Sequence, residues 1–150
     1  SNLDIVSIKS FSEYINFYIA KKITTKKITK HDYSGQTNII SKFCSFYKSE
    51  VERIKDQLDT EKENNFIFGA HIFTQYLLGF GLDQDMFTNV LDNDPSKQNN
   101  RLYGTSLSVS SPQILKNMMN PVVVLKAAMY TEEIKNDIIN NINPTTRFII

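Results

Sequence analysis

The chain has 150 residues, a hydrophobic fraction of 41% and a net charge of +1. This size fits one globular domain with a small attachment, and the neutral balance gives no electrostatic reason to bind nucleic acid. No apolar run is long enough to cross a bilayer, and residues 1–20 lack the apolar segment of a signal peptide. A single cysteine, Cys44, excludes an internal disulfide. We therefore expect a cytoplasmic protein that binds neither nucleic acid nor membranes.

Residues 1–37 are predicted to be a helical segment and linker in front of the main domain, residues 38–150. The large apolar residues of this segment fall near one face of a helix over residues 3–20: Ile5, Ile8, Phe11, Ile15, Tyr18 and Ile19. An apolar face of this kind must pack against another surface, which is the main domain, a second copy of the chain or another domain of a parent protein. The chain begins with Ser1-Asn2 instead of methionine, so we expect it to be part of a longer protein.

Five lysines lie between residues 21 and 30. A solvated helix end or linker is favoured over an anionic contact patch, because the whole chain is close to neutral. A turn at Asp32, Ser34 and Gly35 leads into a second helix, for which Thr37 or Asn38 is the expected N-cap. Apolar residues then recur every three or four positions: Ile39, Ile40, Phe43, Phe46, Tyr47, Val51, Ile54 and Leu58. This is the clearest amphipathic pattern in the chain.

The stretch from Asn65 onward predicts a strand, a helix and a second strand. Residues 65–68 form a short apolar run that ends at Gly69, and residues 72–80 carry an apolar helical stripe. Residues 86–91 supply the second strand and run into an acidic loop that starts at Asp92. This is the opening βαβ unit of a parallel sheet, so the helix amino terminus and the acidic loop should share one sheet edge.

Three more strands are expected, at residues 105–109, 122–125 and 147–150. Between them Ser111 and Pro112 are typical of a helix start, and Thr131 is the expected cap of the next helix. The run of residues 122–125 is apolar throughout, which is typical of a central parallel strand buried on both faces. The predicted fold is therefore α/β: a Rossmann-like parallel five-stranded sheet in the order 3-2-1-4-5, with flanking helices.

The first strand-to-helix turn holds Gly69, Ala70 and His71. The amides of Ala70 and His71 are placed to meet a phosphate at the helix amino terminus. Only the first glycine of a dinucleotide fingerprint is present, because Thr74 stands where a third glycine would be. A plain strand-to-helix turn is therefore an equal alternative. His71 is either a phosphate donor or general base, or a passive turn residue.

The loop after the second strand contains further candidates. Asp92 follows the glycine turn by about 20 residues, where a carboxylate can accept hydrogen bonds from ribose. The alternative is that Asp92 and Asn93 cap amides of their own loop. Lys97, with Arg101, is a candidate diphosphate contact or ordinary surface charge. Lys126 leaves the fourth strand and is expected to join the crevice where the first and fourth strands diverge. No residue set suits a metal ion.

Four short stretches, in this order and spacing, resemble a known family: residues 68–70, 91–98, 103–105 and 110–112. They are similar to the C-terminal domain of the S-adenosylmethionine-dependent sugar C-methyltransferases, and related modules occur in capsule and lipopolysaccharide biosynthesis proteins. The resemblance covers roughly residues 38–150. One departure is Asn99, which stands where the family usually has glycine.

The resemblance implies a domain that helps to hold a nucleotide-diphosphate sugar. Carried over by position, it implicates six residues: Gly69, Ala70, His71, Asp92, Asn93 and Lys97. The family's zinc-module cysteines and its methyl-donor motif are absent, so we expect no cofactor in this chain and no catalysis by the chain alone. S-adenosylmethionine is expected only in a missing domain of the parent enzyme. The alternative function is a non-catalytic interaction or oligomerisation module.

Overall fold

The structure is a computed structural model that describes residues 3–12, 15–22, 24 and 34–150. The chain divides into two compact units, Ser1–Gln36 and Thr37–Ile150. The strands are β1 (Leu3–Ser12), β2 (Ile15–Lys22), β3 (Asn65–Phe68), β4 (Asn89–Leu91), β5 (Val109–Ser110), β6 (Val122–Leu125) and β7 (Arg147–Ile149). The α-helices are α1 (Ser34–Lys55), α2 (Ile72–Gly79) and α3 (Thr131–Asp137), and α3 continues into a π-helical turn at Ile138–Ile142.

The prediction of a helix over residues 3–20 is wrong. This segment forms an antiparallel pair, β1 with β2, in which Ile8 faces Tyr18 and Lys9 faces Phe17. The segment is rich in β-branched and aromatic residues, which favour strands, and its apparent helical stripe is a coincidence of that composition. Most lysines of the 21–30 cluster, and Asp32 of the expected turn, lie outside the described residues.

The larger unit contains a five-stranded parallel sheet in the order β5-β4-β3-β6-β7. This confirms the predicted order 3-2-1-4-5. Strand β3 is central, since Phe66 pairs with Asn89 of β4 on one side and with Val123 of β6 on the other. Strands β3 and β6 are buried at every residue, which confirms the prediction that residues 122–125 are a strand buried on both faces.

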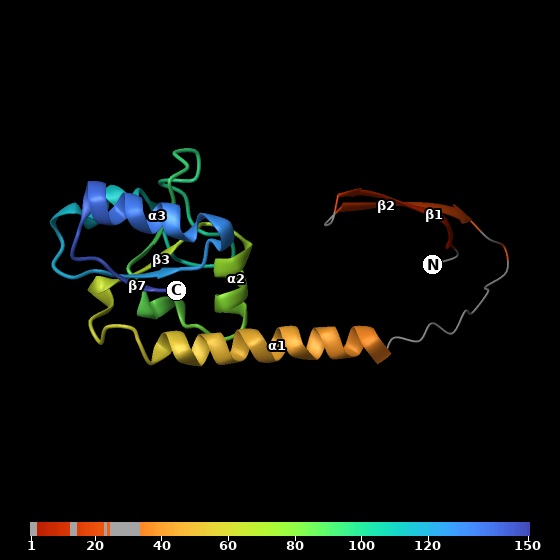
Figure 1. The fold of residues 1–150 in the computed structure, drawn as a ribbon, viewed down its shortest axis with the longest axis horizontal. Helices are drawn as coiled ribbons and strands as arrows, with labels where there is room; N and C mark the ends of the chain where they lie inside the picture. The colour runs from red at the N-terminus through yellow and green to blue at the C-terminus, as the bar shows by residue number, and fades with distance from the viewer. Residues whose placement is uncertain (1–2, 13–14, 23, 25–33) are drawn as a thin grey trace. The chain divides into compact units, whose positions relative to one another are not determined.

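Alternation along the strands divides the core into two layers. Val122 and Val124 point to the face covered by α1 and α2, whereas Val123 and Leu125 point to the face covered by α3 and its π-helical turn. Figure 1 shows α1 and α3 on opposite sides of the sheet. The unit is thus a three-layer α/β sandwich with a continuous apolar core on each face of the sheet.

Several predicted boundaries need correction. Met86 lies in a 3₁₀ turn (Gln84–Met86) capped by the Asp83 side chain, and β4 therefore begins only at Asn89. The predicted strand 105–109 is reduced to β5, because the Thr105 hydroxyl bonds within a tight turn, to the Leu102 carbonyl and the Leu107 amide. The helix after Pro112 is a 3₁₀ helix (Pro112–Asn117), although Ser111 caps it as expected.

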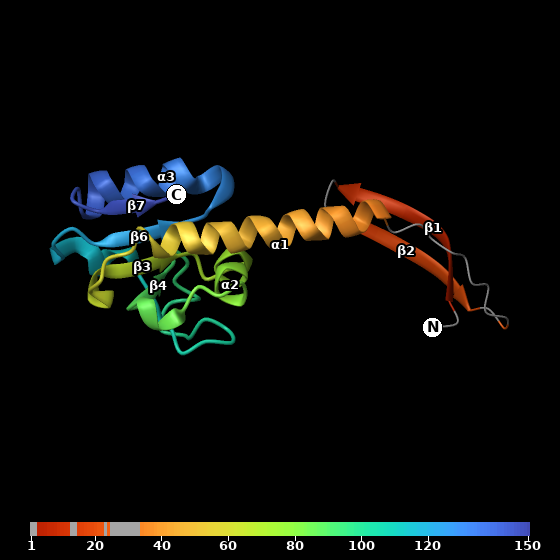
Figure 2. The same ribbon diagram turned by 90° about the horizontal axis from the view of Figure 1, so that it is seen from below.

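Helix α1 begins at Ser34, before the expected N-cap at Thr37 or Asn38. Its stripe is only partly buried: Tyr47, Val51 and Ile54, toward its carboxyl end, join the core. Ile39, Ile40 and Phe43 of its amino-terminal half are exposed, as is Phe46 just past the middle of the helix. That half extends past the end of the sheet (Figure 2). Thr131 is the first residue of α3 and not its cap; its hydroxyl accepts a hydrogen bond from the Ala127 amide.

Candidate functional site: a cleft at the carboxyl ends of the strands

A cleft of about 480 Å³ opens where β3, β4 and β6 end and where α2 and α3 begin. We call it the strand-end cleft. Five of the predicted site residues line it: Gly69, His71, Asp92, Asn93 and Lys97. The cleft lies where the chain crosses from the β4 side of β3 to the β6 side. Open parallel sheets bind ligands at this kind of switch point.

Gly69 is required at the turn between β3 and α2 for two reasons. Its φ of +101° lies in the region that side-chain-bearing residues rarely adopt. A Cβ atom on Gly69 would also clash with Nε2 of His71, so the imidazole ring occupies the space that a larger residue would need. Thr74, which replaces a third glycine, donates its hydroxyl to the Gly69 carbonyl at 2.6 Å and so fixes the helix against the turn.

The amides that we expected to meet a phosphate are both engaged within the protein. The Ala70 amide donates to Oδ2 of Asp92 at 2.8 Å, and the His71 amide donates to the Gly69 carbonyl at 2.9 Å. The next three amides, those of residues 72–74, find no acceptor within the described part of the chain. A phosphate at this helix terminus would therefore contact the first turn of α2 and not the residues before it.

Asp92 joins the turn after β3 to the loop after β4. It is only 7% exposed; Oδ2 accepts from the Ala70 amide and from Nζ of Lys97 at 3.0 Å, and Oδ1 accepts from the Asp94 amide. Burial alone would raise the pKa of Asp92, but these hydrogen bonds outweigh it and hold the pKa below its usual value. One acceptor position, on Oδ1, is left for a ligand. Asp92 thus caps an amide of its own loop, as the alternative interpretation predicted, and its carboxylate keeps one position that can accept a hydrogen bond from a ribose hydroxyl.

His71 forms part of the cleft wall as a neutral imidazole. Burial lowers its pKa, the nearby Asp92 carboxylate opposes that shift, and Lys97 adds to it. Nδ1 is buried and has no hydrogen-bond partner among the residues that the structure describes, and the ring meets Phe73 edge to face with centroids 5.5 Å apart. No carboxylate in the described part of the chain hydrogen-bonds to the ring. This environment suits a polar wall residue better than a general base oriented for catalysis.

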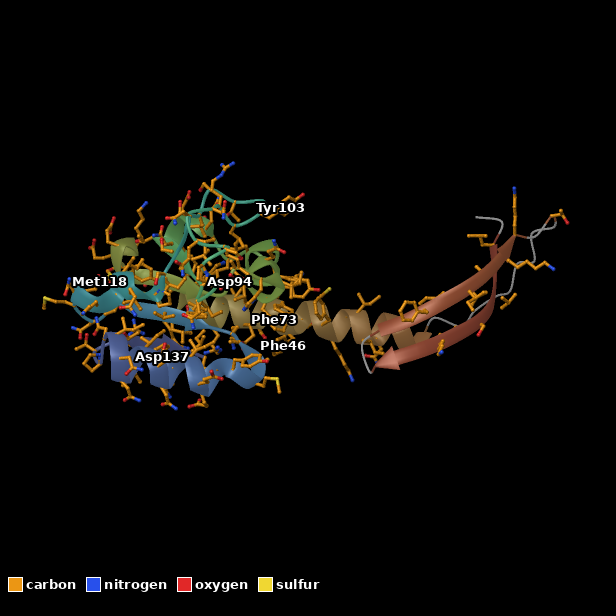
Figure 3. The ribbon with its side chains drawn as sticks, turned by 90° about the horizontal axis from the view of Figure 1, so that it is seen from above. Phe46, Phe73, Asp94, Tyr103, Met118 and Asp137 are labelled. Atoms are coloured by element: carbon orange, nitrogen blue, oxygen red, sulfur yellow. The ribbon has the colours of Figure 1, made fainter. Side chains whose placement is uncertain are left out.

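Lys126 does not join the other predicted residues. It follows Leu125, whose side chain points to the α3 face, so strand alternation directs Lys126 to the α1 face. There its Nζ lies 2.5 Å from Oε2 of Glu50, which also binds Arg53 at 3.0 Å. This group borders a small apolar pocket of about 260 Å³. Figure 3 labels two of that pocket's residues, Phe46 and Phe73, beside each other.

The Glu50 ion pairs should make stability depend on pH. Hydrogen bonds from Arg53 and Lys126 lower the pKa of Glu50 to about 2 despite its burial. Because the folded-state pKa lies below the unfolded value, this contribution is complete above about pH 4.5 and is lost as the pH falls toward 2. We expect Glu50→Gln to lower the free energy of unfolding by about 1–3 kcal/mol at pH 7 and by less at pH 3. Urea unfolding at both pH values measures this difference.

Glu52→Gln is the matched control for that measurement, because Glu52 pairs with Lys55 on the exposed face of the same helix. Its effect should stay below about 1 kcal/mol at either pH. A Glu50→Gln effect that is independent of pH would contradict the assignment of the ion pairs as its cause.

Sequence reasoning missed the apolar wall of the strand-end cleft. Phe73 on α2 and the segment after β6, including Met129 and Tyr130, line it, and both residues of that segment are largely exposed. Large apolar residues directly after a buried strand were the available signal, since a parallel strand's carboxyl end is where a ligand site forms. The cleft is therefore polar on the β4 side and apolar on the β6 side.

Among the described residues, no group of three His, Cys, Asp or Glu side chains could hold a metal ion. None of the helices in the described part of the chain has both the length and the apolar character that crossing a bilayer requires. Comparison with known proteins found no matching family model, no similar curated protein and no similar solved structure. The class that the fold defines is an α/β domain with a Rossmann-like parallel sheet.

Proposed function

We propose that residues 37–150 bind a nucleoside diphosphate, as part of a nucleotide-diphosphate sugar, in the strand-end cleft. The observation that carries this proposal is the convergence of Gly69, His71, Asp92, Asn93 and Lys97 on one cleft at the switch point of the sheet. From the resemblance, we further propose that the chain is the C-terminal part of a sugar C-methyltransferase of surface-polysaccharide synthesis and is not catalytic alone.

The two sides of the cleft suit the two ends of a nucleotide. The aromatic and apolar residues Phe73, Met129 and Tyr130 offer a surface on which a base can pack. On the opposite side, Nζ of Lys97 uses one of its protons for Asp92 and keeps others for a phosphate. The amides of residues 72–74, which have no acceptor among the described residues, add donors at the positive end of α2.

Calorimetric titration with uridine, thymidine, guanosine and cytidine diphosphates tests the proposal. We expect one of them to bind with a Kd below about 1 mM. Lys97→Met should weaken binding about tenfold or more, because it removes the ammonium while keeping most of the side chain. Lys116→Met is the matched control, since Lys116 lies in the 3₁₀ helix after Pro112 and outside the cleft. If Lys97→Met and Lys116→Met weaken binding equally, the nucleotide lies elsewhere.

The exposed half of α1 favours a second candidate function, self-association. Ile39, Ile40, Phe43 and Phe46 leave an apolar stripe on a helix that continues past the sheet, and such stripes commonly pair with a copy of themselves. Light scattering should then find a dimer that Ile40→Glu dissociates. A wild-type chain that remains monomeric at high micromolar concentration, together with measurable nucleotide binding, would eliminate this candidate.

A further inference from the structure

A second hollow lies on the other side of α2, beneath the loop that connects β4 to β5. Its volume is about 740 Å³, and its lining mixes polar side chains, glycines and one aromatic ring: Gln75, Gly79, Gly81, Asp83, Gln84 and Tyr103. We call it the Tyr103 hollow. A volume of this size accommodates a small ligand. The site residues predicted from the sequence are not among the residues that line this hollow.

Tyr103 stands at the tip of an ordered turn with its ring open to solvent. Tyr103 is 88% exposed as a residue, and Figure 3 shows the side chain extending from the loop, away from the sheet. The turn beneath it is closed by the hydrogen bonds of Leu102 with Leu107 and of Thr105 with Leu102. The backbone that carries the ring is therefore fixed, while both faces of the ring remain available for stacking.

The polar groups around the hollow are only partly engaged. Oε1 of Gln84 accepts from the Ser106 amide at 2.9 Å, which holds the side chain, and its Nε2 donates to no described residue. Oδ1 of Asp83 caps the Asp85 amide, whereas Oδ2 has no partner within the described residues. The hollow thus offers an amide donor, a carboxylate acceptor and the Gln75 amide near an open aromatic ring.

We infer that the Tyr103 hollow is a carbohydrate site that takes one pyranose ring. A pyranose has an apolar C–H face, which packs on an aromatic ring, and a rim of hydroxyls, each of which both donates and accepts. An amide and a carboxylate beside the exposed ring of Tyr103 match those two features. The glycine at 79 leaves the floor of the hollow open, since a Cβ there would meet no atom within 4 Å.

The hollow also adjoins the proposed nucleotide site. A third, basic hollow of about 330 Å³, lined by Lys97 and Arg101, shares Gln75 and Tyr103 with the Tyr103 hollow. Lys97 in turn lines the strand-end cleft. A sugar joined to a nucleoside by a diphosphate suits this succession of a cleft with one apolar wall, a basic hollow and an aromatic hollow. This extension to a linked ligand rests on the proposed function, whereas binding of a free sugar does not.

The test is a two-dimensional amide NMR titration with free methyl glycosides of glucose, galactose, mannose, rhamnose and N-acetylglucosamine. We expect at least one of them to shift the amides of Gly79, Gly81 and Gly104 saturably. Tyr103→Ala should weaken that sugar about fivefold or more, while Tyr103→Phe should retain its binding. Gly79→Leu should block it by filling the floor. Tyr130→Ala is the matched control: it removes an exposed tyrosine of the strand-end cleft and should leave sugar binding unchanged.

The outcomes separate this inference from the nucleotide proposal. Saturable sugar binding at the hollow without any nucleotide binding would support the carbohydrate site and overturn the nucleotide proposal. Absence of shifts at the hollow for every glycoside, or equal weakening by Tyr103→Ala and Tyr130→Ala, would overturn the carbohydrate site whatever the nucleotides do. If both ligands bind, a sugar derivative of the nucleoside diphosphate that binds should bind more tightly than that nucleoside diphosphate alone, and Tyr103→Ala should remove that gain. A gain that survives in Tyr103→Ala would overturn the link between the two sites.

Discussion

Val123→Asp should unfold residues 37–150. Val123 is fully buried in β6, where it pairs with Phe66 of the central strand and with Phe148 of β7, and it belongs to the core under α3. A carboxylate at this position finds no partner, and burying it costs several kcal/mol. The total stability of a domain of this size is about 5–15 kcal/mol, so most or all of it should be lost.

Circular dichroism melting curves measure this effect. The same substitution at an exposed strand position, Val6→Asp, is the matched control, because Val6 is more than half exposed on β1. It should leave the melting of the larger unit unchanged. A Val123→Asp variant that still melts cooperatively near the wild-type temperature would contradict the assignment of β6 as a strand buried on both faces.

Asp92→Ala should destabilise the domain by about 2–4 kcal/mol without unfolding it. The substitution removes the acceptor of the Ala70 and Asp94 amides and the partner of Lys97. Each amide left without a partner in a buried place costs about 1–3 kcal/mol. Because the pKa of Asp92 is lowered in the folded state, its contribution is present above the unfolded pKa and fades as the pH falls through the folded pKa.

Urea unfolding of wild type and variant at neutral and acidic pH measures this contribution. Asp94→Ala is the control from the same loop, since the exposed carboxylate of Asp94 accepts hydrogen bonds only from Ser96 among the described residues; we expect it to destabilise the domain much less than Asp92→Ala. Equal losses for Asp92→Ala and Asp94→Ala would mean that Asp92 does not join the turn after β3 to the loop after β4.

The sheet was predictable because its central strands are buried on both faces. Residues 66–68 and 122–125 are continuous apolar runs, and each is followed by turn and helix signals, so a parallel order followed from the rules of βαβ connection. The amino-terminal pair β1–β2 was not predictable in the same way. Its apolar residues occur at spacings that suit both a helix and a strand, and periodicity alone does not separate the two for short segments.

The candidate site was predictable to the level of the strand ends and no further. Gly69, His71, Asp92, Asn93 and Lys97 follow strands that end at one edge, so their convergence on one cleft follows from the strand order. The donors of the first turn were not predictable, because the side chain of Asp92 and the Gly69 carbonyl accept the amides that a phosphate would otherwise meet. The direction of Lys126 was predictable, because side chains alternate between the two faces along β6 and this alternation directs Lys126 toward α1 and Glu50.

The Gly69→Val substitution illustrates how the geometry changes the design of an experiment. Valine at this position is the simplest substitution for blocking the approach of a phosphate to the turn. The positive φ of Gly69 and the imidazole ring of His71 against it mean that valine would strain the backbone and displace the ring. Loss of nucleotide binding in that variant could then result from misfolding of the turn as well as from a blocked contact with the phosphate. Lys97→Met avoids this, because the Lys97 side chain is 40% exposed.

The most direct measurement of the nucleotide proposal is the imidazole NMR signal of His71. The chain has two histidines, His31 and His71, so His71→Asn assigns both signals. Only His71 lies in the strand-end cleft among the described residues. On addition of nucleoside diphosphates up to millimolar concentration, we predict that the His71 signal shifts saturably with at least one of them while that of His31 stays in place. An unchanged His71 signal at saturation with every nucleotide would contradict the proposal that the cleft is a nucleotide site.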